Sequence, residues 1–198
     1  MRIGIFGGTF DPPHLGHLIL AEEAYYQLEL DLVLWVPTSN PPHKPRNNIT
    51  DIHQRLVLVE TAIHDNSHFE ISKIEVNRSP PQYAVDTIQR LKNMKPVDEF
   101  IYLMGADSLV NLHTWYKPDQ FVQLCDGLGI MRRPDTNIIL DDIETHLPGI
   151  RLKIKFINTP LIEISGSLIR GKIKKGHAYR YYLPEKVSFI IEKQKLYR

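Results

Sequence analysis

The fold is decided by the stretch Gly4-Ile5-Phe6-Gly7-Gly8-Thr9-Phe10-Asp11-Pro12-Pro13-His14-Leu15-Gly16-His17. It joins an apolar run over residues 1–6 to an amphipathic run over residues 17–30. A short apolar run is typical of a buried parallel strand, and the amphipathic run is typical of a helix. We therefore expect a strand, a tight turn and the start of a helix, in that order.

Several residues of this stretch suit a turn that binds an anion. Gly7 and Gly8 have no side chain, so the backbone can approach a ligand closely and can adopt positive φ. The backbone N–H groups and the dipole at the start of the following helix favour a phosphate there. His14 and His17 are three residues apart, so both rings can face that phosphate from one side of the helix. Zinc sites use three or four ligands, so we expect no metal to be held by this histidine pair.

Composition limits the class of protein. The chain has 198 residues, which suits a single domain over residues 1–198 with a substantial core. The net charge of +1 gives no reason to expect nucleic acid or a membrane surface as a partner. Cys125 is the only cysteine, which rules out an intrachain disulfide and suits the reducing cytoplasm. We recognise no signal peptide and no apolar run of membrane-spanning length. The oligomeric state is left open.

Strand-like and helix-like segments alternate along the chain. Apolar runs predict strands over residues 2–6, 32–36, 100–104 and 127–131. Residues 69–76 and residues 152–157, the latter with some alternation, are also predicted to be strands. Helical patterns cover residues 17–30, 83–94, 109–115 and 184–195, with further helices starting near Asp51 and Pro118 and one ending at Lys175 before a C-capping Gly176. Residues 135–149 show no clear pattern. The alternation predicts an α/β protein with a doubly wound, Rossmann-like parallel sheet and a small helical portion at the C-terminus.

Unusual segments follow five of the six predicted strands. Ligands bind beyond the carboxyl ends of parallel strands, so these segments should meet in one site. They are residues 7–17 after the first strand, the loop around Lys44 after the second, residues 105–107 after the fourth, Arg133 after the fifth and residues 165–170 after the sixth.

The run Gly7-Gly8-Thr9-Phe10-Asp11-Pro12, followed by His14-x-Gly16-His17, resembles the signature of the nucleotidylyltransferase superfamily. These enzymes join a nucleoside triphosphate to a phosphate-bearing acceptor and release pyrophosphate. The resemblance implies that His14 and His17 donate to phosphoryl oxygens during the reaction. It implies that ATP is bound by Gly7, Gly8, Thr9, Phe10 and Gly16.

A second motif follows the last predicted strand. The superfamily carries Ile-Ser-Ser-Thr-x-Ile-Arg there, and this chain reads Ile164-Ser165-Gly166-Ser167-Leu168-Ile169-Arg170. Gly166 therefore stands where the family has a serine, and any side-chain contact from that position is lost. The resemblance implies that Ser165, Ser167 and Arg170 hold the β- and γ-phosphates and that Lys44 places a positive charge on them. Gly105 and Asp107 would contact the rest of ATP, Asp107 at the ribose, and Mg²⁺ would bridge the phosphates.

Three further segments resemble the nicotinate mononucleotide adenylyltransferase branch. They are Gly105-Ala106-Asp107-Ser108-Leu109 with Trp115 six residues on, Pro41-Pro42-His43-Lys44, and Tyr83-Ala84-Val85-Asp86-Thr87. The resemblance implies that Trp115 stacks on the pyridine ring of nicotinate mononucleotide and that the backbone N–H groups of Ala84 and Tyr116 hold its carboxylate. Arg133 would hold the acceptor phosphate, and Arg132 beside it is interpreted as a surface charge. The product would be deamido-NAD.

The residues leave other functions open. The signature alone allows another acceptor, such as phosphopantetheine, FMN, glycerol phosphate or nicotinamide mononucleotide, and it allows a nucleotide sensor without catalysis. Trp115 could also be an ordinary core residue. We find no Ser-His-Asp or Cys-His constellation. A phosphate monoester needs none, because its second pKa of about 6 leaves it deprotonated near neutral pH.

Overall fold

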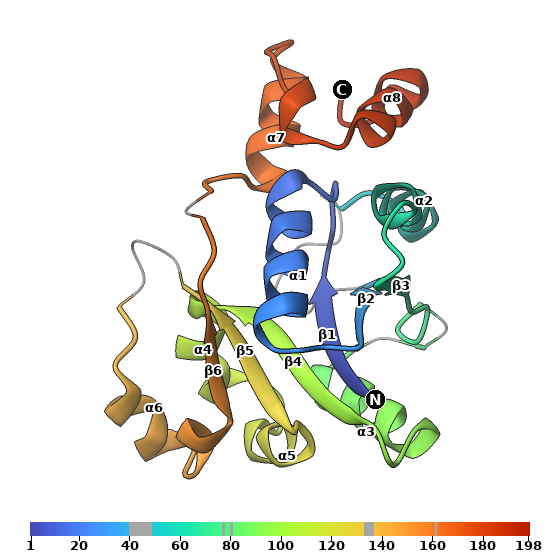
Figure 1. Ribbon diagram of the computed structural model, residues 1–198. Helices are drawn as coiled ribbons and strands as arrows, with labels where there is room; N and C mark the ends of the chain where they lie inside the picture. Colours follow the sequence, from blue (N-terminus) through green and yellow to red (C-terminus); the bar gives the residue numbers. More distant parts are fainter. Residues whose placement is uncertain (40–48, 77, 80, 133–136, 161) are drawn as a thin grey trace.

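The protein is built on one six-stranded parallel sheet. The computed structural model describes residues 1–39, 49–76, 78–79, 81–132, 137–160 and 162–198. The strand order β3-β2-β1-β4-β5-β6 reverses direction between β1 and β4, which is the doubly wound arrangement that the sequence predicts (Figure 1). The strands are β1 (Arg2–Gly8), β2 (Leu32–Pro37), β3 (Phe69–Ile71), β4 (Glu99–Gly105), β5 (Gly127–Met131) and β6 (Ile154–Ile157).

Helices connect the strands and cover both faces of the sheet. The α-helices are α1 (Leu15–Gln27), α2 (Ile52–Ile63), α3 (Ala84–Met94), α4 (Ala106–Val110), α5 (Pro118–Leu124), α6 (Leu140–His146), α7 (Gly166–Lys174) and α8 (Glu185–Gln194). Short 3-10 helices span Leu112–Thr114, Ile150–Lys153 and Arg180–Tyr182. Among the described residues, no helix has both the length and the apolar composition needed to cross a membrane.

Side chains of the inner strands alternate between two hydrophobic clusters, as the pleat requires. In β4, Phe100 and Met104 join the cluster that α3 and α5 cover, whereas Ile101 and Leu103 join the cluster covered by α1 and α2. Cys125 is fully buried in the first cluster, and burial raises the pKa of its thiol to about 12. It therefore acts as a small apolar core residue, as the sequence suggests.

The helices after β6 form a separate layer above the carboxyl edge of the sheet (top of Figure 1). Ile169 and Ile173 of α7 pack with Val187 and Ile191 of α8, and Leu58 of α2 closes this third cluster. Gly176 ends α7 with φ of 68°, which confirms the predicted C-cap. The small C-terminal helical portion thus rests on α2 through apolar contacts.

Three predicted elements differ from the structure. The strand predicted over residues 69–76 ends at Ile71, since its partner strand β2 ends at Pro37, which has no N–H to continue the ladder. The strand predicted over residues 152–157 begins at Ile154, because a 3-10 turn after Gly149 buries Ile150 instead of Leu152.

The third difference concerns the helix predicted over residues 109–115. It starts earlier, at Ala106, and α4 ends at Val110 before the short 3-10 turn Leu112–Thr114. The side-chain amide of Asn111 donates to the carbonyl of Asp107 at 2.8 Å, and such local hydrogen bonds compete with helix continuation. The sequence of residues 135–149 shows no clear pattern, and the structure contains α6 within this span.

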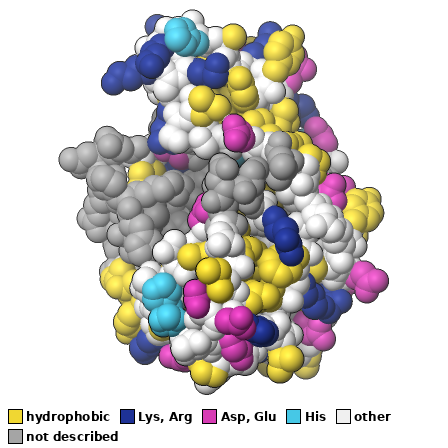
Figure 2. Space-filling view, turned by 90° about the vertical axis from the view of Figure 1, so that its left-hand side faces the viewer, with side chains coloured by type: hydrophobic (Ala, Val, Ile, Leu, Met, Phe, Trp, Pro, Cys, Tyr) yellow, Lys and Arg dark blue, Asp and Glu magenta, His cyan; other side chains and the backbone are white. Residues whose placement is uncertain are grey.

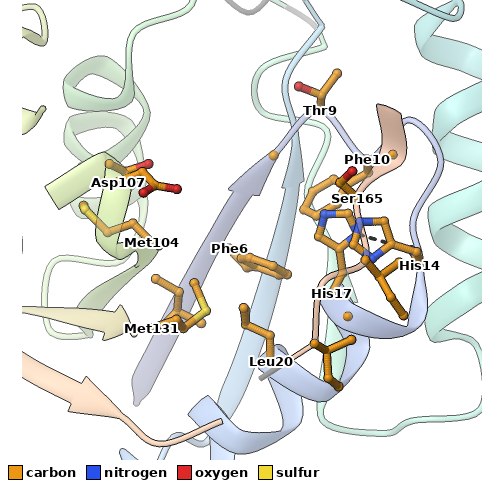
Figure 3. A pocket seen from close by; sticks show the side chains of 18 of the residues that line it. Phe6, Thr9, Phe10, His14, His17, Leu20, Met104, Asp107, Met131 and Ser165 are labelled. Carbon is orange, nitrogen blue, oxygen red and sulfur yellow. Dashed lines mark hydrogen bonds between the residues drawn. The ribbon is translucent and has the colours of Figure 1, made fainter. Parts of the chain in front are cut away.

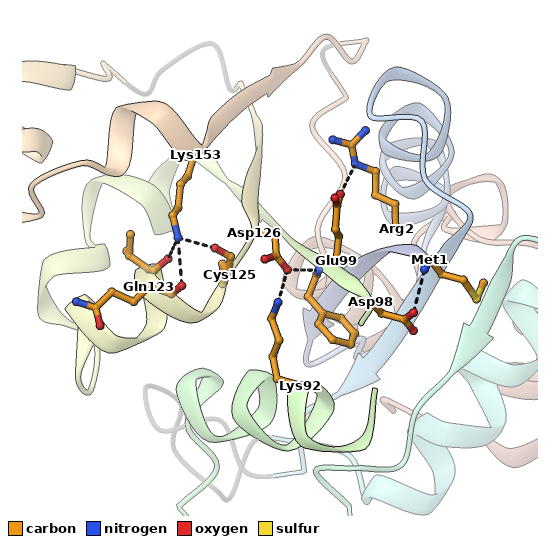
Figure 4. Close-up of polar contacts among 11 residues, drawn as sticks. Met1, Arg2, Lys92, Asp98, Glu99, Gln123, Cys125, Asp126 and Lys153 are labelled. Carbon is orange, nitrogen blue, oxygen red and sulfur yellow. Dashed lines mark hydrogen bonds and ion pairs between the residues drawn. The ribbon is translucent and has the colours of Figure 1, made fainter. Parts of the chain in front are cut away.

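The amino edge of the sheet is fastened by charged groups, away from the cavity described below (Figure 4). The ammonium of Lys153 donates to the carbonyls of Val122 and Cys125, both at 2.7 Å, where α5 ends. Asp126 accepts from Lys92 at 2.5 Å and from the backbone N–H of Phe100 at 2.7 Å. A cation at a helix C-terminus is favourable, and these contacts hold α3, α5 and β6 to the strands.

Candidate active site

The loop after β1 departs from its predicted backbone geometry. Positive φ occurs at Phe10, at 47°, and at neither Gly7 nor Gly8. The two glycines serve close packing instead, because a Cβ on Gly7 would lie 2.7 Å from the hydroxyl of Tyr102 and one on Gly8 would lie 2.8 Å from the Phe10 ring. The Phe10 side chain is 2 % exposed and packs on Phe6 and Trp35. Any ATP contact from residue 10 must therefore come from its backbone.

The two histidines lie at the start of α1. His14 is the N-cap residue, and its backbone N–H donates to Nδ1 of His17 at 3.2 Å. The rings stack, with centroids 3.6 Å apart and planes 25° apart. Because Nδ1 of His17 accepts this hydrogen bond, the neutral ring carries its proton on Nε2. The Phe10 ring packs on that of His17 in a T-shaped arrangement, with centroids 5.0 Å apart, and further fixes its orientation.

A cavity of about 840 Å³ opens at the carboxyl edge of the sheet. Figure 3 shows His14, His17 and Ser165 on one side of it, Met104 and Asp107 on the opposite side, and Phe6 between them. Residues from β1, β4, β5 and the β6–α7 connection meet here, as predicted from the strand ends. Thirteen predicted residues line it: Gly7, Gly8, Thr9, Phe10, His14, Gly16, His17, Gly105, Asp107, Trp115, Ser165, Ser167 and Arg170.

The N-terminus of α7 forms another wall of the cavity, and its groups suit the binding of phosphate. Ser165 is the N-cap residue and accepts from the backbone N–H of Leu168 at 3.2 Å, while its hydroxyl lies 3.1 Å from that of Ser167. Arg170 reaches the signature loop, where its Nη1 donates to the backbone carbonyl of Asp11 at 2.6 Å. The helix dipole, two hydroxyls and a guanidinium thus point to one region that suits anions.

The predicted acceptor residues are placed in part. Trp115 is half-buried, lines the cavity and packs on Tyr102 and Phe121. Tyr116 does not line the cavity, but its ring stacks on that of Tyr83 with centroids 4.2 Å apart. This stack brings Ala84, the first residue of α3, beside Tyr116. Ala84 is likewise not among the residues that line the cavity.

Two predicted cations lie outside the described residues, Lys44 and Arg133. Arg132, interpreted from the sequence as a surface charge, is exposed and also lines the cavity. Its guanidinium lies over the Phe156 ring, 4.3 Å from the centroid. The fifth strand therefore does deliver a cation to the site, one residue earlier than the predicted one.

Comparison with known proteins identifies the family. The model of the cytidylyltransferase-like family matches residues 5–172. A protein of Exiguobacterium sibiricum, named a probable nicotinate-nucleotide adenylyltransferase, is 40% identical over 197 residues, covering 100% of this chain and 99% of the relative. The nicotinate-nucleotide adenylyltransferase of Bacillus subtilis is 37% identical over 196 residues, covering 99% of this chain and 98% of the relative. The chain belongs to the nicotinate-nucleotide adenylyltransferase family.

Solved structures agree with this family at the level of fold. The nicotinic acid mononucleotide adenylyltransferase of Plasmodium falciparum, solved in complex with NaAD, superposes with a TM-score of 0.83. That match covers 99% of this chain and 97% of the other, at 21% sequence identity. The Rossmann-like sheet of this adenylyltransferase family member is therefore shared with a distant relative.

Arg55 supports the loops behind the site, and the motifs of the family did not reveal it. It is fully buried, and its guanidinium donates to four backbone carbonyls: Thr50 at 2.8 Å, Thr9 at 2.7 Å, Thr38 at 2.9 Å and Ser39 at 3.2 Å. Burial lowers the pKa of Arg55, and the nearby charge of Asp11 opposes that shift. The sequence does carry a signal, since Arg55 falls on the apolar stripe of α2 between Ile52 and Val59.

A buried polar cluster beside α3 was also missed. Glu75 is 6 % exposed and accepts from the hydroxyl of Thr87 at 2.7 Å. Burial raises the pKa of Glu75, although the hydrogen bond from Thr87 opposes the rise. Arg78 donates to the backbone carbonyl of Tyr83 at 3.3 Å, and Gln82 to that of Arg78 at 2.8 Å. These bonds hold the start of α3, the helix that begins with Ala84.

Proposed function

We propose that this protein transfers the adenylyl group of ATP to nicotinate mononucleotide, giving deamido-NAD (nicotinate adenine dinucleotide) and pyrophosphate in NAD biosynthesis. The observation that carries the proposal is one cavity in which His14, His17 and Arg170 face Asp107 and Trp115. The full-length similarity to proteins named nicotinate-nucleotide adenylyltransferase supports the choice of acceptor. A cytoplasmic location accords with the single buried cysteine.

The reaction is a direct in-line attack without a covalent enzyme intermediate. The nucleophile is an oxygen of the acceptor phosphate, which is deprotonated near neutral pH because its second pKa is about 6. No general base is required, and the protein must align two anions and stabilise the charge that grows on the α-phosphoryl oxygens and the leaving pyrophosphate. A cavity lined by donors and cations meets that requirement.

The histidines supply donors on the α-phosphoryl side. The hydrogen bond from His14 N–H to Nδ1 of His17 leaves the Nε2 proton of His17 as the donor to a phosphoryl oxygen. This donor is already oriented before substrate arrives, since the ring is stacked on His14 and bounded by Phe10. Such preorganised donors cost little reorganisation during the reaction.

The start of α7 would bind the β- and γ-phosphates. Its N-cap residue Ser165, the hydroxyl of Ser167 and the side chain of Arg170 line the cavity together. Gly166 offers a backbone N–H without a side chain in the way. Lys44 would add a further charge on the phosphates, and Asp107 would bind the ribose hydroxyls from the opposite wall. Gly105 continues that wall at the end of β4.

Mg²⁺ fits this site as a companion of ATP. Among the described residues, no three His, Cys, Asp or Glu side chains form a group that could hold a metal. Mg²⁺ usually keeps several waters and binds through substrate phosphates and one or two carboxylates. Glu163, close to Ser165 in the chain, is a carboxylate on the cavity wall that would supply such an oxygen. The cation would neutralise negative charge on the triphosphate.

The acceptor would lie toward Trp115. A flat pyridine ring can stack on the indole, and the start of α3 next to Tyr116 offers backbone N–H groups for its carboxylate. Arg132 and Arg133 are the cations that follow β5 and would face the acceptor phosphate.

No nucleic acid or membrane enters the reaction. Figure 2 shows acidic and basic side chains interspersed over the lower part of one face of the molecule.

A pyrophosphate-release assay tests the proposal. The purified protein is given ATP and Mg²⁺ with each of nicotinate mononucleotide, nicotinamide mononucleotide, phosphopantetheine, FMN and glycerol phosphate. We expect the highest kcat/KM with nicotinate mononucleotide. Turnover of another acceptor while nicotinate mononucleotide stays inert would overturn the assignment. Binding of ATP without pyrophosphate release for any acceptor would favour a nucleotide sensor.

A further inference from the structure

The C-terminal end of the chain contacts the signature loop. The phenol of Tyr197 donates to Oδ1 of Asp11 at 2.7 Å, although 186 residues separate the two in sequence. Asp11 is only 5 % exposed and lies between Phe10 and the start of α1. A buried carboxylate is costly unless donors occupy its oxygens, so the phenol does more than fill space.

Asp11 joins two further parts of the structure to this loop. Its Oδ2 accepts from the backbone N–H of Thr50 at 3.2 Å, just before α2. Its backbone carbonyl accepts from Nη1 of Arg170 at 2.6 Å, and Oδ2 lies 3.9 Å from the same guanidinium nitrogen. Movement of the Asp11 side chain would therefore be felt by a residue that we assign to the phosphates of ATP.

The backbone near the C-terminus is shaped to bring Tyr197 to this place. Lys195 and Tyr197 both adopt the left-handed conformation, with φ of 54° and 67°. Such conformations are unfavourable for residues other than glycine and persist only where other contacts impose them. Leu196 supplies those contacts, because its side chain is buried against α7 and α8 and its N–H donates to the carbonyl of Ile191 at 3.1 Å.

The ionisation of Tyr197 suits a permanent donor. Burial raises the pKa of its phenol, and the charge of Asp11 raises it further. The hydroxyl therefore stays protonated throughout the neutral range and can always donate to the carboxylate. The hydrogen bond from Tyr197 to Asp11 is therefore maintained at physiological pH.

We propose that Tyr197 is a positioning residue for ATP binding: it holds the carboxylate of Asp11, and through Asp11 the signature loop and Arg170. This inference rests on the proposed function to the extent that ATP is the substrate. Tyr197 does not line the cavity, so its effect on ATP would pass entirely through Asp11. It should act on the triphosphate and leave the acceptor side near Trp115 unaffected.

The test compares Tyr197→Phe with Tyr181→Phe, which alters a tyrosine that is 88 % exposed in the same C-terminal portion. Titration calorimetry with α,β-methylene ATP, well below the melting temperature, should show about three- to tenfold weaker binding for Tyr197→Phe, the usual size of one lost hydrogen bond. KM for ATP should rise by a similar factor, and KM for nicotinate mononucleotide should not change. Tyr181→Phe should match the wild type. A lower melting temperature with unchanged ATP-analogue affinity would overturn the proposal.

A measurement on the unaltered protein provides a second test. If Tyr197 favours ATP binding, then ATP binding must stabilise the contact of Tyr197 in return. Saturating α,β-methylene ATP should therefore slow amide hydrogen exchange at Leu196 and Tyr197, and unchanged exchange there would contradict the proposal. The calorimetric and hydrogen-exchange measurements both use α,β-methylene ATP without an acceptor. If nicotinate mononucleotide proves inert while these effects are present, only the acceptor assignment fails.

Discussion

The backbone N–H of His14 donates to Nδ1 of His17 at 3.2 Å, and the two rings stack 3.6 Å apart. The first turn of α1 thereby sets the tautomer of His17 and the stacked orientation of both candidate catalytic rings. This arrangement predicts that they serve as hydrogen-bond donors to phosphoryl oxygens and have no role as bases.

Replacement of His17 by alanine should reduce kcat by about 10²–10³, since it removes a preorganised donor to developing charge. The free energy of unfolding should change less than kcat, because the ring is only half-buried and the backbone N–H of His14 can donate to water once Nδ1 of His17 is removed. Steady-state kinetics and urea unfolding measure the two effects. His113→Ala provides the control, since His113 is exposed and outside the large cavity. An unchanged kcat in His17→Ala would remove this histidine from the mechanism.

Replacement of Trp115 by alanine should raise KM for nicotinate mononucleotide much more than KM for ATP. The indole lines the cavity on the side of β4 and α4, away from the α7 wall that we assign to the triphosphate. Trp115→Phe keeps an aromatic face and should lose less than the alanine variant. The measurement is the pair of KM values in each variant. Equal changes in both would show that Trp115 supports the fold and does not stack on substrate.

The sequence predicts which segments meet at the cavity, because each carries a local motif. The turn after β1, the residues after β4 and the start of α7 each show their chemistry within a few residues, and parallel strand order brings them together. Arg55 and Tyr197 could not be assigned in this way. Their partners are backbone carbonyls and a carboxylate from distant segments, so their roles depend on packing that no local pattern contains.

The ends of the helices and strands likewise depend on packing between segments that are distant in the sequence. The strand predicted through Val76 stops at Ile71 because pairing depends on the neighbour β2 and its terminal Pro37. The two glycines of the signature could adopt positive φ, yet positive φ occurs at Phe10. There the aromatic ring gains burial against Trp35, which offsets the backbone cost.

Replacement of Arg55 by methionine should destabilise the protein by at least about 3 kcal/mol, because four buried carbonyls lose their donor. Arg55→Lys should recover only part of this, since an ammonium cannot span the same acceptors as a planar guanidinium. Urea unfolding provides the measurement, and Arg90→Met, at an exposed position of α3, provides the control. A loss below about 1 kcal/mol in Arg55→Met would contradict the role described for this guanidinium.

Replacement of Glu75 by glutamine should alter the pH dependence of stability. Burial raises the folded pKa of Glu75 above its ordinary value of 4.5, so the native state binds the proton more tightly than the unfolded chain. By linkage, the contribution of this group is most favourable at low pH and declines as pH rises from about 4.5 through the raised pKa. Glutamine cannot ionise and can still accept from Thr87. The variant should therefore gain stability relative to the wild type between pH 4 and pH 8 in urea unfolding; a relative loss would mean that the carboxylate is favoured.

Gly166 provides the sharpest test of how α7 meets the signature loop. A Cβ at this position would lie 2.6 Å from the carbonyl oxygen of Asp11, which is backbone and cannot swing aside. Gly166→Ala should therefore displace the start of α7, lengthen the 2.6 Å bond from Arg170 to Asp11 and weaken binding of α,β-methylene ATP about three- to tenfold. Gly171→Ala is the matched control, since a Cβ there meets nothing within 4 Å. It should stabilise α7 by about 0.5–1 kcal/mol and leave ATP affinity unchanged. Helix propensity alone predicts that both substitutions stabilise, so equal behaviour of the two variants would show that the close approach to Asp11 does not constrain the site.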